Sequence, residues 1–168
     1  MIILGVDPGI RHTGWVVLDD QTVVGRGTIV PPGRGKMLVS QALSFILPEI
    51  AAVLAAYHPS IASVEEVTWY GKTRRITLPL SHVTGAVAGV CLASGVSVCL
   101  LLANMRKNIK GPRGSAKWTE HERDAYALAT VLRKHLVALA AGEASALPAR
   151  SAIPKRIITA LVNAHGSG

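Results

Sequence analysis

Short hydrophobic runs near the N-terminus alternate with polar residues and glycines in a pattern typical of strands. Three of these runs contain several β-branched residues, and they cover residues 1–6, 14–18 and 21–29. The triplet Asp7-Pro8-Gly9 separates the first two runs. Because Asp, Pro and Gly favour tight turns, the pattern predicts three strands in an antiparallel meander.

After the third run, the spacing of hydrophobic residues changes to that of an α-helix. One apolar stripe predicts a first helix, which Pro48 could kink. The stripe consists of Leu43, Ile46, Leu47, Ile50, Val53, Leu54 and Tyr57. Further along, the pattern predicts strands over residues 61–67 and 96–102, and helices over residues 79–94 and 119–141.

Three strands followed by alternating helices and strands indicate an α/β domain. We expect a mixed five-stranded sheet, with its first three strands antiparallel, flanked by helices. We assign residues 1–141 to this domain. Residues 142–168 form a C-terminal tail with a possible short helix at residues 155–164.

One uncharged stretch, residues 83–103, is long enough to form a transmembrane helix. Three glycines interrupt it and strand-forming valines follow, so a helix, a glycine turn and a buried strand explain it better. Cys91 and Cys99 within it are typical of buried free thiols in a reducing cytosol. The N-terminus also lacks the pattern of a signal peptide. We therefore expect a cytoplasmic protein with no membrane partner.

Basic residues outnumber acidic ones along the chain. The sequence has 18 Lys and Arg against 10 Asp and Glu, which gives a formal net charge of +8. Such a charge favours a polyanionic partner, either nucleic acid or an anionic membrane surface. Charge alone does not choose between these two.

Two basic clusters are candidate DNA contacts. Trp69 and Tyr70 lead into the first cluster, and exposed aromatic rings beside cations can stack on bases, although a core position explains either ring equally well. The second cluster lies in a glycine-bearing loop whose backbone amides can approach phosphates. With Arg11, the candidate phosphate-binding residues are Lys72, Arg74, Arg75, Arg106, Lys107, Lys110 and Arg113.

Acidic residues stand where predicted strands end. Asp7 closes the first strand and Glu65 the fourth, while His121 and Asp124 lie three residues apart on one face of the last helix. If the first and fourth strands are neighbours, these side chains converge. Carboxylates at close range need a counter-charge. Oxygen ligands suit Mg²⁺, and an imidazole leaves Mn²⁺ plausible, so the pattern predicts a two-metal site for phosphodiester hydrolysis.

Each of these residues also has a simpler interpretation. Asp7 could serve only the turn, and Glu65 could belong with Glu66 to a solvated strand end. On the last helix, Asp124 could be a solvated acid and His121 a surface histidine. The argument for a site therefore rests on the four residues occurring together.

Four segments resemble, in order and approximate spacing, those of RuvC-type Holliday junction resolvases of the RNase H-like superfamily. The segments read ILGVDPGIRHTGW, ASVEEV, KNIKGPRGSAK and HERDAYALA. The resemblance covers residues 1 to about 135 and implies an RNase H-like fold. It also implies a homodimeric, Mg²⁺-dependent endonuclease that nicks two strands of a four-way DNA junction symmetrically and needs no nucleotide cofactor. A short stretch from Lys117 to His121 resembles compact phage-like versions.

The resemblance implies roles for particular residues. Lys117 is similar to the family's lysine near the scissile phosphate, and the family's strand ending favours Glu65 over Glu66. The helix over residues 79–94 is implied to form the dimer. The family's catalytic metal ligands match Asp7, Glu65, His121 and Asp124.

Other classes of function also fit part of the sequence. An actin-like ATPase or sugar kinase shares the Asp-x-Gly turn but needs a second lobe. A non-catalytic junction- or RNA-binding module would need only the basic charge. Among nucleases, an RNase H-like enzyme acting on RNA or a broader branched-DNA nuclease is the alternative.

Overall fold

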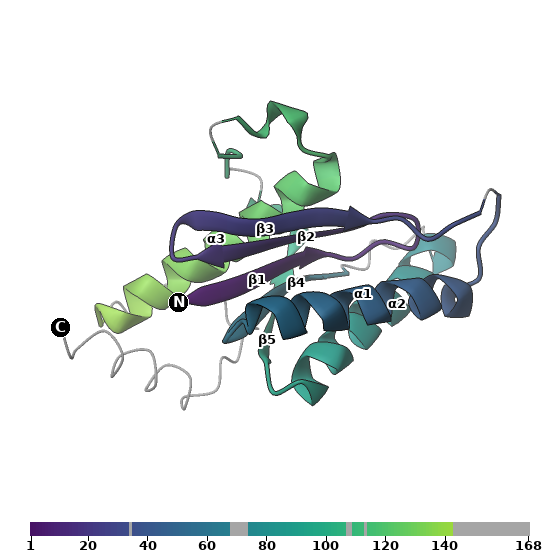
Figure 1. Ribbon diagram of the computed structural model, residues 1–168, viewed down its shortest axis with the longest axis horizontal. Helices are drawn as coiled ribbons and strands as arrows, with labels where there is room; N and C mark the ends of the chain where they lie inside the picture. Colours follow the sequence, from purple (N-terminus) through teal and green to yellow (C-terminus); the bar gives the residue numbers. More distant parts are fainter. Residues whose placement is uncertain (34, 68–73, 107–108, 113, 143–168) are drawn as a thin grey trace.

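Five strands form one mixed sheet in the computed structural model, which describes residues 1–33, 35–67, 74–106, 109–112 and 114–142, with only the backbone of residues 74–76 (Figure 1). The strands are β1 (Ile2–Asp7), β2 (Thr13–Asp19), β3 (Thr22–Ile29), β4 (Ile61–Glu66) and β5 (Ser97–Leu102). Their order is β3-β2-β1-β4-β5. β1 and β3 pair antiparallel with β2, whereas β4 pairs parallel with β1 and β5. The predicted sheet, with its first three strands antiparallel, is therefore confirmed.

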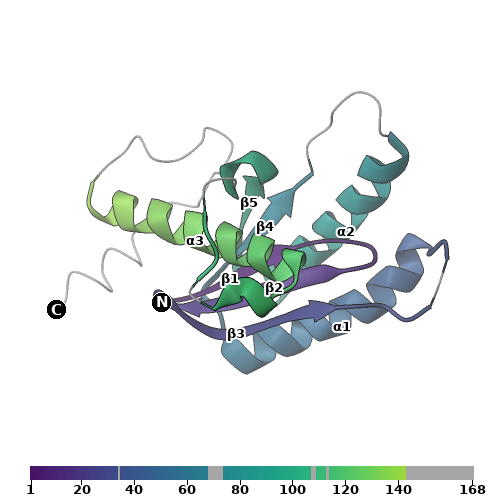
Figure 2. The same ribbon diagram turned by 90° about the horizontal axis from the view of Figure 1, so that it is seen from above.

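Helices cover both faces of this sheet (Figure 2). α1 (Val39–Tyr57) and α2 (Arg74–Ala93) pack on one face, and α3 (Glu120–Ala140) packs on the other. Two short 3₁₀ helices, η1 (Ala103–Arg106) and η2 (Ser115–Lys117), lie between β5 and α3. The molecule thus has three layers, with the sheet in the middle.

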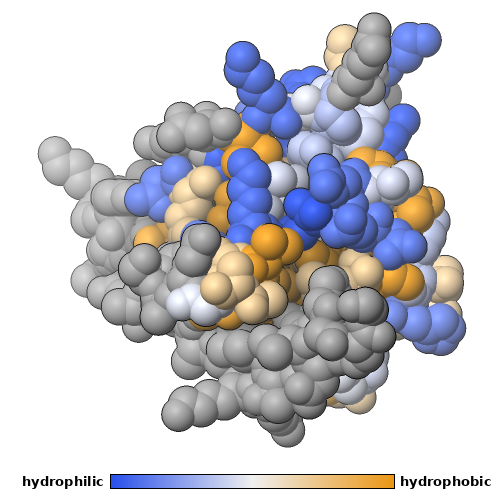
Figure 3. Space-filling model, turned by 90° about the vertical axis from the view of Figure 1, so that its left-hand side faces the viewer, coloured by the Kyte–Doolittle hydropathy of each residue, from blue (hydrophilic) through white to orange (hydrophobic). Residues whose placement is uncertain are grey.

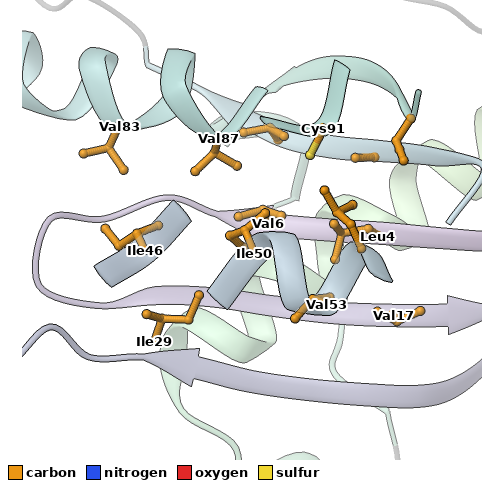
Figure 4. Packing of buried hydrophobic residues seen from close by; sticks show 14 of the residues in the cluster. Leu4, Val6, Val17, Ile29, Ile46, Ile50, Val53, Val83, Val87 and Cys91 are labelled. Atoms are coloured by element: carbon orange, nitrogen blue, oxygen red, sulfur yellow. The ribbon is translucent and has the colours of Figure 1, made fainter. Parts of the chain in front are cut away.

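The alternation of side chains along the strands creates one hydrophobic core on each face of the sheet. In β1, Leu4 and Val6 belong to the core under α1 and α2, whereas Ile3 belongs to the core under α3. Figure 4 shows Val83 and Val87 of α2 directed toward the β1 residues of the first core. β1 is therefore held in place by packing against α1 and α2 on one face and against α3 on the other.

Two apolar segments raise the question of a membrane. As expected, residues 83–102 form the end of α2, a turn in which Gly95 has a φ of 78°, and β5; residue 103 begins η1. α1 satisfies the length and composition of a membrane span, but one of its faces, including Ile46 and Ile50, is buried in the core. On the face shown in Figure 3, hydrophobic side chains lie in small areas among hydrophilic ones.

The second helix begins earlier than its sequence predicts. The sequence pattern predicts that this helix begins at residue 79. In the structure, α2 begins at Arg74 and Pro79 lies inside it. A proline there removes one backbone hydrogen bond, and the burial of Val83, Val87 and Cys91 in the core offsets that loss. The tail and its possible helix at residues 155–164 lie outside the described residues and stay a prediction.

Candidate active site

Asp7 and Glu65 stand side by side at the carboxyl ends of two adjacent parallel strands. Val6 of β1 is opposite Val64 of β4, so the next residue of each strand carries an acid at the same edge of the sheet. The two carboxyl groups are hydrogen-bonded to each other. Their side chains are only 10% and 17% exposed, respectively. The expected neighbourhood of the first and fourth strands is confirmed.

Two glycines allow α3 to lie directly on the sheet beside these acids. A Cβ at Gly5 would lie 2.1 Å from the carbonyl oxygen of Ala125, and one at Gly14 would lie 2.2 Å from that of His121. Any side chain at these positions would therefore push the helix away. This close approach brings His121 to Asp7, with 2.7 Å between Nδ1 and Oδ2.

The first turn of α3 is also fixed by a capping box. The Glu122 N–H donates to Thr119 Oγ1 at 3.1 Å, and the Thr119 N–H donates to a Glu122 carboxylate oxygen at 2.7 Å. Arg26 of β3 pairs with the other Glu122 oxygen at 2.7 Å. These contacts hold the turn that carries His121 over the end of the sheet.

Arg106 lies among the acidic residues. It ends η1, directly after β5, and its Nη2 lies 3.4 Å from Glu65 Oε1. Its Nη1 contacts Asp124 Oδ2. The sequence indicated Arg106 as one of several DNA-binding residues in a loop. The structure instead places its guanidinium between two of the predicted metal ligands.

The acidic residues are short of positive charge. Burial raises the pKa of Asp7, against the opposing effects of the hydrogen bond from Glu65 and the charge of Arg106. Burial, followed by the hydrogen bond and negative charge of Asp7, raises the pKa of Glu65 to about 8. At neutral pH the pair therefore retains a proton, and an added cation would favour its release.

These residues line one cavity of about 450 Å³. The set consists of Asp7, Pro8, Gly9, Glu65, Glu66, Val67, Thr77, Leu80, Thr84, Arg106, Glu120, His121 and Asp124. In the described part of the chain, no three His, Cys, Asp or Glu side chains are arranged to bind one ion together. The structure thus brings the four predicted ligands to one cavity but not into one coordination shell.

The donor chemistry of this cavity nevertheless fits a hard divalent cation. Mg²⁺ commonly takes one or two protein carboxylates and completes its shell with water and phosphate oxygens. The carboxyl groups of Asp7 and Glu65 share a proton because too little positive charge lies near them, and a bound Mg²⁺ would replace that proton. A guanidinium beside Glu65 and Asp124 shows that a cation is already favoured there. Of the two adjacent glutamates, Glu65 makes the contacts with Asp7 and Arg106.

Two residues at the site were not found from the sequence. Glu120 lines the cavity at the start of α3. The ring of His12 stacks on that of His121, with centroids 5.4 Å apart and an angle of 11° between the planes. The proximity of His12 to the Asp-Pro-Gly turn was the only available signal, since nothing in its own segment indicates a partner on α3.

Most of the predicted DNA contacts lie outside the cavity or outside the described residues. Arg11 donates to the carbonyl oxygen of Gly33 at 3.0 Å. Lys110 and Lys117 are exposed, and neither lines the cavity. The backbone of Arg74 and Arg75 begins α2, but their side chains are not described. The predicted contacts outside the described residues are Trp69, Tyr70, Lys72, Lys107 and Arg113.

Comparison with known proteins identifies the family. The sequence model described as "Crossover junction endodeoxyribonuclease RuvC" matches residues 3–139. The chain belongs to the RuvC family. Its members are metal-dependent nucleases. Membership decides against the actin-like ATPase or sugar kinase that the Asp-x-Gly turn left open.

Individual RuvC proteins match parts of the chain. The crossover junction endodeoxyribonuclease RuvC of Azorhizobium caulinodans is 38% identical over 100 residues, covering 57% of each protein. The RuvC of Rhodopseudomonas palustris strain TIE-1 is 34% identical over 122 residues, covering 70% of this chain and 68% of that protein. The alignment thus spans little more than half the length of the first relative.

Solved RuvC structures share the fold. The Thermus thermophilus RuvC structure matches 84% of this chain and 97% of its own length, with a TM-score of 0.66 and 18% identity. T. thermophilus RuvC in complex with Holliday junction substrate matches 77% of this chain and 90% of its own, with a TM-score of 0.64 and 20% identity. The expected RNase H-like α/β fold is confirmed.

Proposed function

We propose that this RuvC-family chain is a metal-dependent endonuclease that resolves four-way DNA junctions by paired, symmetric nicks. The observation that carries the proposal is the meeting of Asp7, Glu65, His121 and Asp124 on one cavity at the carboxyl ends of β1 and β4. A protein that only bound DNA would gain nothing from buried acids facing a phosphate backbone. The relatives carry the name crossover junction endodeoxyribonuclease.

The substrate we propose is branched DNA. T. thermophilus RuvC, which shares the fold, has been solved with a Holliday junction. The net charge of +8 supplies sequence-independent attraction to phosphates. We assign phosphate binding to the two basic clusters and Arg11, base stacking to Trp69 or Tyr70, and contact near the scissile phosphate to Lys117.

Mg²⁺ is the cofactor we propose, with Mn²⁺ as a substitute and two ions per site. Asp7, Glu65, Asp124 and His121 are the residues that would hold it. When bound, a divalent cation lowers the pKa of water and stabilises the charge on the leaving oxygen of the phosphodiester. The attacking water would leave a 3′ hydroxyl and a 5′ phosphate.

The residues of the chain itself orient the reacting groups. Asp7 Oδ2 meets His121 Nδ1 at 2.7 Å and fixes the plane of the imidazole, and the stacked ring of His12 supports it from one face. Nε2 is then the imidazole atom left to bind an ion or to accept a proton. The half-buried carboxyl of Asp124 lies on the same helical face, one turn further along α3.

A second copy of the chain would complete the enzyme. A four-way junction has near two-fold symmetry, so a two-fold dimer would place one site on each of two strands. The exposed face of α2 suits this role, because Leu78 and Leu92 are 58% and 60% exposed. Apart from the neighbouring backbone of α2 itself, a Cβ built on Gly85 or Gly89 has no described atom within 4 Å. We propose that α2 forms the dimer contact.

We also propose that the protein acts in the cytoplasm. Both cysteines, Cys91 and Cys99, are free and buried. Free thiols of this kind are typical of a reducing compartment. A cytoplasmic nuclease would also reach chromosomal DNA directly in a bacterium such as those that carry its relatives.

Cleavage of labelled substrates tests the proposal. Purified protein is incubated with end-labelled four-way junction, fork, duplex and RNA–DNA hybrid, in Mg²⁺ or in EDTA. We expect symmetric nicks in the junction in Mg²⁺ only. Asp7→Asn should abolish cutting and preserve junction binding. Asp19→Asn makes the same change in the neighbouring strand β2, opposite the start of β1 and away from the cavity, and should leave both intact. Junction binding without cleavage by the wild type would instead support a binding module.

A further inference from the structure

Arg106 has a position that its proposed role in binding DNA does not explain. Its guanidinium spans Glu65 and Asp124, at 3.4 Å from Glu65 Oε1 and in contact with Asp124 Oδ2. The three side chains are only 17–27% exposed. Among the described residues that line the cavity, Arg106 carries the only permanent positive charge.

The fold holds Arg106 in this position. β5 is parallel to β4, so the chain leaves β5 at the edge where Glu65 lies and turns at once into η1. Met105, next to Arg106, packs against the core under α3. The backbone of η1 is thereby anchored between the sheet and the helix that carries Asp124. The guanidinium is not a loosely placed surface group.

A guanidinium and a metal ion compete for the same carboxylate oxygens. Arginine has five N–H donors and no acceptor, so it satisfies carboxylate oxygens but cannot coordinate a cation. The oxygens that Arg106 contacts belong to two residues to which we assign metal binding. An ion and the guanidinium would therefore require the same lone pairs and would repel each other.

We propose that Arg106 is a built-in counter-cation that occupies the Glu65–Asp124 pair in the metal-free protein and competes with the divalent ion for it. This inference rests on the proposed metal site. Arg106 is then a positioning residue that keeps the two acids together before the ion arrives. The same contact weakens metal binding, because the contacts of the guanidinium with Glu65 and Asp124 must be broken or shared when the metal enters.

Metal binding itself, measured without DNA, tests this competition. Mn²⁺ serves as the probe in isothermal titration of the full chain. Arg106→Gln removes the charge and keeps a hydrogen-bonding side chain, and Arg106→Ala removes both. Arg133→Ala is the matched control, because Arg133 pairs with the exposed Asp20 at 2.9 Å and lies outside the cavity.

We expect both Arg106 variants to bind Mn²⁺ at least about tenfold more tightly than the wild type, which is about 1.4 kcal/mol. Arg133→Ala, with the same loss of net charge, should stay within about twofold because Arg133 lies outside the cavity and salt screens charges at a distance. In EDTA, the Arg106 variants should melt at a lower temperature than the wild type, and Mn²⁺ should raise their melting temperature more than it raises that of the wild type.

The possible failures are distinguishable. If the wild type binds Mn²⁺, Asp7→Asn weakens that binding, and the Arg106 variants bind equally or more weakly, the metal site stands and the competition is refuted. An equal gain in Arg133→Ala would assign the effect to net charge and refute it too. If no variant binds Mn²⁺, the proposed metal site fails and the inference fails with it. Should Arg106→Ala not fold, Arg106→Gln alone decides.

Discussion

Replacing Glu65 by glutamine probes the electrostatics of the site without DNA or metal. The Glu65 carboxyl is buried beside Asp7, and its pKa rises from 4.5 to about 8. A glutamine amide has nearly the shape of the protonated carboxyl but does not ionise. We therefore expect Glu65→Gln to stabilise the metal-free protein at alkaline pH while it abolishes cleavage.

The direction of this effect follows from the raised pKa. Below pH 4.5 the Glu65 carboxyl is protonated in both the folded and the unfolded chain, so the substitution changes little. Between pH 4.5 and about 8, ionisation favours only the unfolded chain, and the wild type loses stability as the pH rises. One pKa unit corresponds to about 1.4 kcal/mol, so the shift sets an upper limit of about 5 kcal/mol on the free energy of unfolding that Glu65→Gln would regain at high pH. Because the titration is shared with Asp7 and opposed by Arg106, we expect about 2 kcal/mol.

Urea unfolding in EDTA measures the free energy of unfolding of both proteins at about pH 5 and about pH 8.5, on either side of most of the titration. The stabilisation by Glu65→Gln should be small at the lower pH and near its maximum at the higher one. Glu66→Gln, the same change at the next position of β4, is the matched control. An equal gain at both pH values, or none at the higher one, would refute the electrostatic reasoning.

Two further predictions follow from the geometry and one from the charges predicted to bind DNA. Gly5→Val should cost at least about 2 kcal/mol in urea unfolding, because a Cβ there meets a carbonyl oxygen of α3 at 2.1 Å; an unchanged midpoint would contradict that contact. Arg74→Ala and Arg75→Ala should each lower the salt dependence of junction binding by about one unit of log–log slope, and an unchanged slope would remove them from the DNA surface. His12→Ala should lower kcat at an unchanged KM, whereas His12→Phe, which keeps an aromatic ring for stacking, should retain most of the activity; equal losses in both would argue against a stacking role.

The sequence predicted the part of the site that depends on strand ends and helix periodicity. Asp7 follows an apolar run that only a buried strand explains, and Glu65 ends a second such run. Because parallel strands end at the same edge of a sheet, one assumption about their pairing sufficed to bring the acids together. His121 and Asp124 followed from their spacing on a helix. These inferences needed only local patterns and a topology that few alternatives satisfy.

Residues whose role depends on how a loop folds back could not be placed in this way. Arg106 is one of several cations in a glycine-bearing segment, and nothing in its neighbours distinguishes it from Lys110. The distinction arises because η1 forms directly after β5 and its Met105 packs under α3. Lys110, four residues further on, is exposed. Charge alone predicts that both residues bind DNA. The fold instead places Arg106 beside Glu65 and Asp124 and leaves Lys110 exposed.

The cations that contribute to the net charge of +8 differ in how they attract DNA. A cation that faces solvent attracts the DNA backbone at long range, and salt screens its effect. The guanidinium of Arg106 is held by its contacts with Glu65 and Asp124, so it contributes to DNA binding only after those contacts are broken. If the ion releases the guanidinium of Arg106, metal loading would add one phosphate-binding group at the place where the phosphate is cut.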